Sequence, residues 1–214
     1  MFHIYIKGTF TDESQLIQGK TLPKSAVPFR EGETIHDAFQ LGFLLSLPVM
    51  LPMVGLSIFR CSGLDKKLQF NSHMAAAVLV FFVLLKVLTY LHEFIHALFY
   101  PVKAEKTVWK DAKQGAYFIY CDVPVTKYHF IMLSIAPSIL LGIVPFIAWY
   151  QLAPLFHVEW LLCFMALTWI MTLMSIGDFA NVFHAITQVP ANAKVLNYGL
   201  HSYWIKERYN SDEL

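Results

Sequence analysis

The chain has 214 residues, of which 57% are hydrophobic and only 14% are charged. Hydrophobicity this high excludes a disordered chain. Three cysteines without a C-x-x-C pair exclude a disulfide scaffold and a cysteine-based zinc module. A net charge of +1 gives no electrostatic footprint for nucleic acid, so we expect no nucleic-acid partner. The charged fraction is far below the ~25% of ordinary soluble domains. Together with a mean hydropathy of +0.51, it predicts an integral membrane protein in contact with the lipid bilayer.

The N-terminal part, residues 1–37, is polar and mixed, and we expect it to be a cytoplasmic segment. It has no short apolar core behind a basic start, so a cleavable signal peptide is not expected. Its stretch FHIYIKGTF alternates apolar and polar residues and could form a strand. Pro23 and Pro28 favour extended chain after that stretch.

Four apolar stretches follow, each long enough to cross a bilayer, which takes about 20 residues. They run from about 38–59, 74–100, 130–150 and 159–177. We therefore expect an all-α membrane protein, a bundle of about four transmembrane helices, with a four-span membrane domain over 38–190.

Two segments outside the spans carry turn and strand signals. Between the second and third spans, Thr107–Lys110, a turn near Asp111–Gly115, and Ala116–Cys121 predict a short cytoplasmic β-hairpin within about 105–123. After Pro190, residues 191–214 form a tail whose KVLNYGLHSYWIKE stretch fits a strand or a short amphipathic helix, and the pattern does not decide between them.

The basic residues predict how the spans are oriented. With four spans, the N-terminal segment, the hairpin connection and the C-terminal tail lie on one side, and these three segments carry most of the lysines and arginines. The positive-inside rule puts that side in the cytoplasm. We expect a multi-pass protein of the cell membrane with both termini cytoplasmic. The basic residues on that side are Lys7, Lys20, Lys24, Arg30, Lys103, Lys106, Lys110, Lys113, Lys127, Lys194, Lys206 and Arg208.

The second span ends in LTYLHEFIHALFY, which contains an HExxH motif formed by His92, Glu93 and His96. Residues four apart lie on one helix face, so both imidazoles can reach one metal ion, for which Zn²⁺ is the expected choice. Glu93, beside the first ligand, is placed to take a proton from a metal-activated water. Three ionisable groups within five residues of a span are costly, which favours a functional site near the cytoplasmic face.

A zinc site needs a third protein ligand and an open position for water. Asp178 is the carboxylate at the cytoplasmic end of the fourth span, at a depth that matches His92, and it is the preferred candidate. Asn181, one turn further on, could hold a substrate carbonyl or orient the aspartate. Three other residues stay open as rival third ligands: His184, Glu105 and His129.

HEFIH on one span and GDFAN at the end of another resemble the site-2 protease group of intramembrane zinc proteases. More narrowly, the chain is similar to a family of small bacterial membrane proteins described as "putative zincin peptidases", formerly a domain of unknown function. The resemblance extends from about Leu22 to Tyr198 and includes VPVTKYHFIMLSIAP and a GD-x-x-N pattern. Site-2 proteases usually place the aspartate before a glycine, whereas Gly177 precedes Asp178 here, which favours the smaller family.

The resemblance implies that His92, His96 and Asp178 bind zinc and that Glu93 is the catalytic base. The expected function is a zinc-dependent, membrane-embedded endopeptidase whose partners are membrane or membrane-proximal protein substrates. The free edge of the hairpin could take an extended substrate as a further strand. Two alternatives stay open: a non-catalytic membrane scaffold or regulator with a metal site, and a small transporter. An intact Glu93 favours the enzyme, because a purely structural metal site needs no base.

Overall fold

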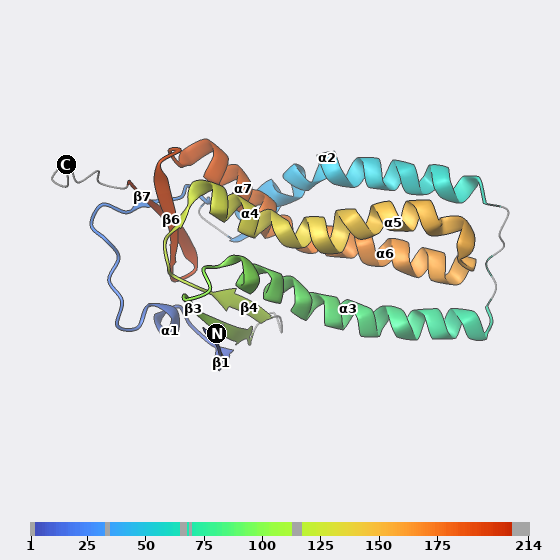
Figure 1. Cartoon of the computed structure of the whole chain (residues 1–214), viewed down its shortest axis with the longest axis horizontal. Helices are drawn as coiled ribbons and strands as arrows, with labels where there is room; N and C mark the ends of the chain where they lie inside the picture. Colours follow the sequence, from blue (N-terminus) through green and yellow to red (C-terminus); the bar gives the residue numbers. More distant parts are fainter. Residues whose placement is uncertain (1–2, 33–34, 65–67, 69, 113–116, 207–214) are drawn as a thin grey trace. The chain divides into compact units, whose positions relative to one another are not determined.

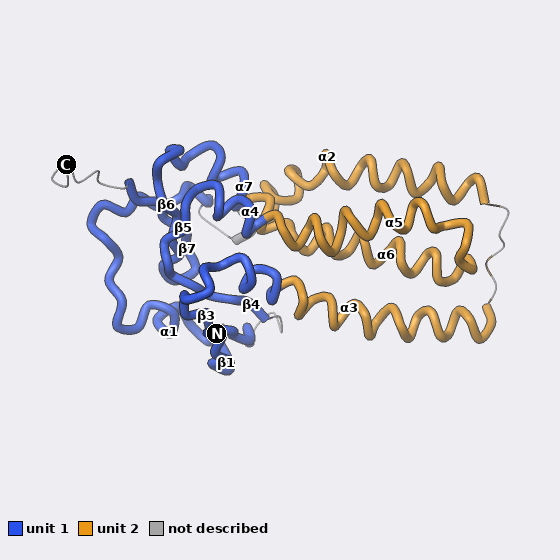
Figure 2. The backbone as a smooth tube through the Cα atoms, in the orientation of Figure 1, with its two compact units in different colours: residues 1–33, 93–134, 181–214 blue, residues 34–92, 135–180 orange. Residues whose placement is uncertain are grey.

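The computed structural model describes residues 3–32, 35–64, 68, 70–112 and 117–206. The chain forms two compact units (Figure 2), each built from segments far apart in the sequence. Unit 1 comprises residues 1–33, 93–134 and 181–214, and unit 2 comprises residues 34–92 and 135–180.

Unit 2 is helical (Figure 1). Its elements include α2, most of α3, a π-helical segment η1, α5, the 3₁₀ turn η2, α6 and the start of α7. Helix α4 joins η1 directly and crosses between the units, as α3 and α7 do. The bounds are α2 (Ile35–Ser62), α3 (Ser72–Phe99), α4 (Lys127–Pro137), η1 (Ser138–Ile143), α5 (Val144–Leu152), η2 (Ala153–Leu155), α6 (Val158–Met174) and α7 (Ile176–Gln188).

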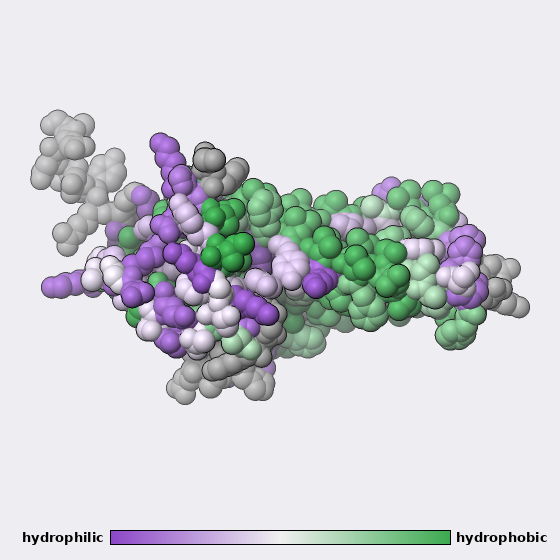
Figure 3. Space-filling view, turned by 90° about the horizontal axis from the view of Figure 1, so that it is seen from below, coloured by the Kyte–Doolittle hydropathy of each residue, from purple (hydrophilic) through white to green (hydrophobic). Residues whose placement is uncertain are grey.

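Three stretches of helix in the described residues are long and apolar enough to cross a membrane: Phe39–Ser62, Ser72–Phe99 and Lys127–Leu155. Helices α6 and α7 meet at a bend of 42° and would make a fourth span if the pair crosses together. Apolar side chains gather over the long helices in Figure 3, and polar ones gather over unit 1. These lengths are compatible with the expected four spans, and the membrane itself stays a prediction.

The core of unit 2 lies where α2, α5 and α6 pack together. It contains Met50 and Met53 from α2, Phe146 and Trp149 from α5, and Leu161 from α6. The Trp149 indole N–H donates to the Leu161 carbonyl at 2.9 Å, so this buried aromatic side chain has its polar atom satisfied. These three helices therefore form the packed part of the unit.

Helix α2 comes close to the break between α6 and α7 at Gly42, which is buried. A Cβ atom added there would lie 2.1 Å from the Ile176 backbone oxygen, a distance that real Cβ atoms do not reach. Only glycine allows this approach. A Cβ atom added at Gly55, further along α2, would meet no neighbouring atom within 4 Å.

This contrast gives a stability prediction. We expect Gly42→Ala to destabilise the protein by about 1–3 kcal/mol, because the clash is with backbone and α2 must move. Gly55→Ala should be neutral or stabilising by up to about 1 kcal/mol, because it removes a flexible residue from a helix interior. Thermal unfolding of the two purified variants measures both values. Equal melting temperatures would contradict the close approach.

Unit 1 contains two β-sheets and the short helix α1 (Ser14–Ile17). The three-stranded sheet has the order β1-β3-β4, with β1 parallel to β3 and β4 antiparallel to it. The four-stranded sheet has the order β2-β7-β6-β5 and is antiparallel. The bounds are β1 (His3–Phe10), β2 (Val27–Pro28), β3 (Glu105–Asp111), β4 (Tyr117–Tyr120), β5 (Val125–Thr126), β6 (Ala193–Tyr198) and β7 (His201–Lys206).

The all-α class expected from the sequence is therefore wrong, because seven strands within the described residues form two sheets. The antiparallel pair β3–β4 agrees with the expected hairpin, whose turn falls partly on residues 113–116, outside the described residues. Strands β1, β2 and β5 depend on distant partners. His3 pairs with Glu105, and Val125 pairs with Val195. Strands β2 and β5 have two residues each, too few for a pattern to indicate them.

The C-terminal tail forms the β6–β7 hairpin rather than an amphipathic helix. Its turn contains Gly199 at φ +63°, a left-handed conformation that favours glycine in tight hairpins. The Glu13 carboxylate accepts from the Leu200 N–H at 2.9 Å, so the N-terminal segment holds this turn. The two ends of the sequence are thus parts of one folded unit.

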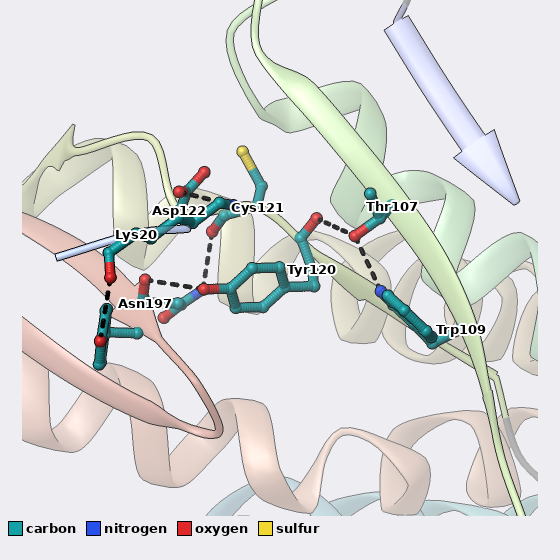
Figure 4. A network of polar contacts seen from close by, with 8 residues as sticks. Lys20, Thr107, Trp109, Tyr120, Cys121, Asp122 and Asn197 are labelled. Atoms are coloured by element: carbon teal, nitrogen blue, oxygen red, sulfur yellow. Dashed lines mark hydrogen bonds and ion pairs between the residues drawn. The ribbon is translucent and has the colours of Figure 1, made fainter. Parts of the chain in front are cut away.

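A second set of contacts joins the N-terminal segment to β4 (Figure 4). Lys20 pairs with Asp122 at 2.8 Å, and its ammonium group lies 5.2 Å from the centre of the Tyr120 ring. Burial, assisted by the Asp122 charge, raises the pKa of Tyr120 to about 12. The Tyr120 phenol therefore stays neutral through the physiological range and packs with Phe10, Leu16 and Trp109 in a small core.

Candidate metal centre

Helix α3 carries the HExxH motif on its last turns. His92 is buried, with 4% of its surface exposed, while Glu93 and His96 are half-buried. The helix runs unbroken to Phe99, so the spacing of His92 and His96 is that of one helical turn, as the sequence predicts. Glu93 comes directly after His92 on this helix, one residue from the first imidazole.

Asp178 reaches His92 from helix α7. Its Oδ2 atom lies 3.3 Å from His92 Nε2, and both residues belong to unit 2. Asp178 stands in the first turn of α7, which begins just after the break at Ser175, and a carboxylate is favoured at a helix N-terminus. The break between α6 and α7 therefore places this acidic residue in an environment that stabilises its charge.

One candidate metal-binding group is formed by His92, His96 and Asp178, and each offers a ligand atom within 4.8 Å of the others. The donor set suits zinc, which takes imidazole nitrogen and carboxylate oxygen at about 2.0–2.2 Å. Two ligands at that distance in a tetrahedral site are separated by roughly 3.4 Å, close to the 3.3 Å between His92 and Asp178. Three protein ligands leave the fourth position open, as a catalytic site requires.

The backbone of α4 orients the His96 ring. His96 Nδ1 lies 2.9 Å from the Leu133 carbonyl oxygen. A carbonyl can only accept, so Nδ1 carries the proton and the lone pair stays on Nε2. Ligating histidines usually donate their other ring N–H to such an acceptor, which fixes the tautomer and the ring plane.

The edge of the three-stranded sheet holds Glu93. The Ile119 N–H of β4 donates to Glu93 Oε2 at 3.2 Å. Strand β4 is the last strand of its sheet in the described residues. The carboxylate of the motif is therefore fixed to a strand edge as well as to its helix.

The C-terminal end of α3 is also held. The Lys106 side chain is fully buried, and its ammonium group donates to the carbonyls of Pro101 at 2.8 Å and Ala104 at 3.2 Å. The His129 ring hydrogen-bonds to the carbonyl of Phe99, the last residue of α3. Donors at a helix C-terminus satisfy carbonyls that have no partner within the helix. His129 therefore keeps the end of the motif helix from fraying, while Lys106 holds the connection that follows the helix.

The three residues that stayed open as rival third ligands have other surroundings. His129 binds the end of α3, and Glu105 lies exposed on β3. His184 is buried, and its Nδ1 accepts from Gln188 Nε2 at 2.7 Å. None of the three belongs to the candidate group found among the described residues. Asn181 lies half-buried one turn beyond Asp178 on α7, and its role in substrate binding stays a prediction.

Sequence reasoning did not identify the Leu133 carbonyl or the Ile119 N–H. Both are backbone groups. Every residue has a backbone carbonyl and every residue except proline has a backbone N–H, so residue identity carries no signal for either. The one available sign was Pro137, four residues after Leu133, because a proline deprives the carbonyl four positions earlier of its helical donor.

Residues 85–194, about half of the chain, match the family described as "Putative zincin peptidase". The chain belongs to this family. The matched region contains all of α7 and the whole HExxH motif. Membership in the zincin peptidase family makes the protein a peptidase in general terms and implies a zinc cofactor. No curated protein and no solved structure matches the chain.

Proposed function

We propose that this zincin peptidase is a membrane-embedded, zinc-dependent endopeptidase, similar in its chemistry to the site-2 proteases. The observation that carries the proposal is the contact of 3.3 Å between His92 and Asp178, with His96 one turn further along the same helix. Two neutral donors and one carboxylate make a ligand set for zinc, and Glu93 lies next in the chain to the first of them.

The chain's own residues have separate tasks in peptide hydrolysis. A bound zinc ion would supply Lewis acidity, which acidifies water and polarises a carbonyl. His92, His96 and Asp178 hold the ion. Glu93 accepts the proton that the attacking water loses and delivers it to the amine of the leaving peptide. Asn181, on the helix of Asp178, is available to hold the substrate carbonyl by hydrogen bonding.

The substrate must be extended when it is cut, because a helix hides its carbonyls in internal hydrogen bonds. Strand β4 offers an edge for such a segment, and its Ile119 N–H already points to Glu93. A substrate strand added there would run past the catalytic carboxylate. We propose membrane or membrane-proximal proteins as substrates, since the motif lies on one of the long apolar helices.

The proposed placement is a multi-pass protein of the cell membrane, with both termini and the active site on the cytoplasmic side. The basic residues outside the spans support it through the positive-inside rule. The motif stands at the end of α3 that leads into the connection with five of these lysines.

The test uses the purified full chain in nanodiscs with tagged membrane peptides as substrates. We expect chelation to stop cleavage and stoichiometric Zn²⁺ to restore it, with the tag released by hydrolysis of a peptide bond. Mass spectrometry of both fragments identifies the bond. Cleavage that continues at full rate after complete zinc removal would contradict the proposal.

A further inference from the structure

Helix α4 ends at Pro137, a fully buried residue directly before the π-helix η1. In an α-helix the carbonyl of residue 133 would accept from the N–H of residue 137. Proline has no N–H, and its ring also pushes against that carbonyl. The Leu133 oxygen therefore lacks its ordinary helical donor.

The same oxygen accepts from the His96 ring, at 2.9 Å from Nδ1. We propose that Pro137 is a positioning residue for the metal centre. By withholding an N–H, Pro137 leaves the Leu133 carbonyl to His96, which fixes the proton on Nδ1 and directs Nε2 to the metal. The part of this inference that concerns zinc rests on the proposed function, whereas the tautomer of His96 does not.

The chain beyond Pro137 does not return at once to α-helical geometry. Residues Ser138–Ile143 form a π-helix, in which the Val144 N–H donates to the Ile139 carbonyl five residues earlier. Such segments are rare and are common at functional sites. Gly142 of this segment lies against Thr172 of α6, where an added Cβ would be 2.2 Å from the Thr172 hydroxyl oxygen. Close packing therefore holds the widened turn that follows Pro137.

The fold offers a matched control in the same span. Pro145, near the start of α5, also lacks an N–H and so also leaves a carbonyl of the preceding turn without a backbone donor. Pro145 does not belong to the candidate metal group found among the described residues. Replacing either proline with alanine restores one backbone N–H donor. Only the donor restored at residue 137 would compete with His96 for the Leu133 carbonyl.

The first measurement is zinc affinity of the full chain, by competition with a chelator. We expect Pro137→Ala to weaken binding about 10–100-fold, the usual cost of losing an orienting partner of a metal ligand. Pro145→Ala should stay within about twofold of the wild type. An unchanged affinity in Pro137→Ala, or an equal loss in both variants, would overturn the proposal.

The second measurement needs no metal. Nitrogen-15 NMR of histidine-labelled, zinc-free protein reports which ring nitrogen of His96 is protonated. We expect protonated Nδ1 in the wild type and in Pro145→Ala, and a mixture of tautomers in Pro137→Ala. A retained Nδ1 proton in Pro137→Ala would overturn the proposal even if the protein proved not to be a protease. Conversely, if the expected tautomers were found but the wild-type chain did not bind added zinc, the positioning role would stand and the proposed function would fall.

Discussion

Glu93→Gln is expected to lower peptide cleavage at least ~100-fold while zinc stays bound, because general acid–base catalysis contributes about 10²–10⁴-fold. The amide is nearly the same size as the carboxylate and can still accept from the Ile119 N–H through its oxygen. What it loses is the capacity to take up and release a proton. Single-turnover cleavage and metal analysis of the same preparation measure both quantities.

Glu105→Gln is the matched control for this variant. Glu105 is an exposed acid on β3, outside the candidate metal group of the described residues. It should cleave at the wild-type rate. Stoichiometric zinc together with wild-type cleavage in Glu93→Gln would end the claim that Glu93 is the base. Stoichiometric zinc with no cleavage by the wild type would favour a metal-bearing scaffold over an enzyme.

Asp178→Ala is expected to weaken zinc binding by more than ~100-fold, beyond the 10–100-fold typical of losing a partner outside the ligand set. The carboxylate supplies one of three donors and the negative charge beside His92. Removing it leaves two imidazoles on one helix, and two protein ligands bind zinc far less tightly than three. Chelator competition and thermal unfolding with and without zinc measure the change.

His184→Ala is the control that separates the two candidates for the third ligand. His184 is as buried as His92, so its truncation removes a similar side chain from the interior. Its ring accepts from Gln188, and we expect this variant to lose some stability but keep stoichiometric zinc. Zinc retained by Asp178→Ala and lost by His184→Ala would mean that His184, and not Asp178, is the third ligand.

The sequence indicates those parts of this protein that depend on local spacing. HExxH on an apolar helix places His92 and His96 one turn apart whatever surrounds them, and α3 has that geometry. The hairpin strands β3 and β4 are close in sequence and carry turn signals between them, and they pair as expected. The meeting of Asp178 with His92 needed a further argument, the matching depth of two helix ends.

The sheets were missed because β1, β2 and β5 pair with strands far away in the sequence, and because β2 and β5 are short. Strand β1 lies beside β3 across about a hundred residues, and strands β2 and β5 have two residues each. The alternation of apolar and polar residues in FHIYIKGTF suggested a strand, but such a pattern does not indicate which other strand it pairs with. The all-α class followed from counting long apolar helices, which dominate the composition, while the strands lie in the polar segments between and beyond them.

Zinc-edge anomalous diffraction or X-ray absorption on the purified full chain tests the central claim most directly. We expect one zinc ion bound by two imidazole nitrogens and one carboxylate oxygen at about 2.0–2.2 Å, among His92, His96 and Asp178. A zinc ion held by other residues, or wild-type protein that cleaves peptides with no metal at these three side chains, would contradict it.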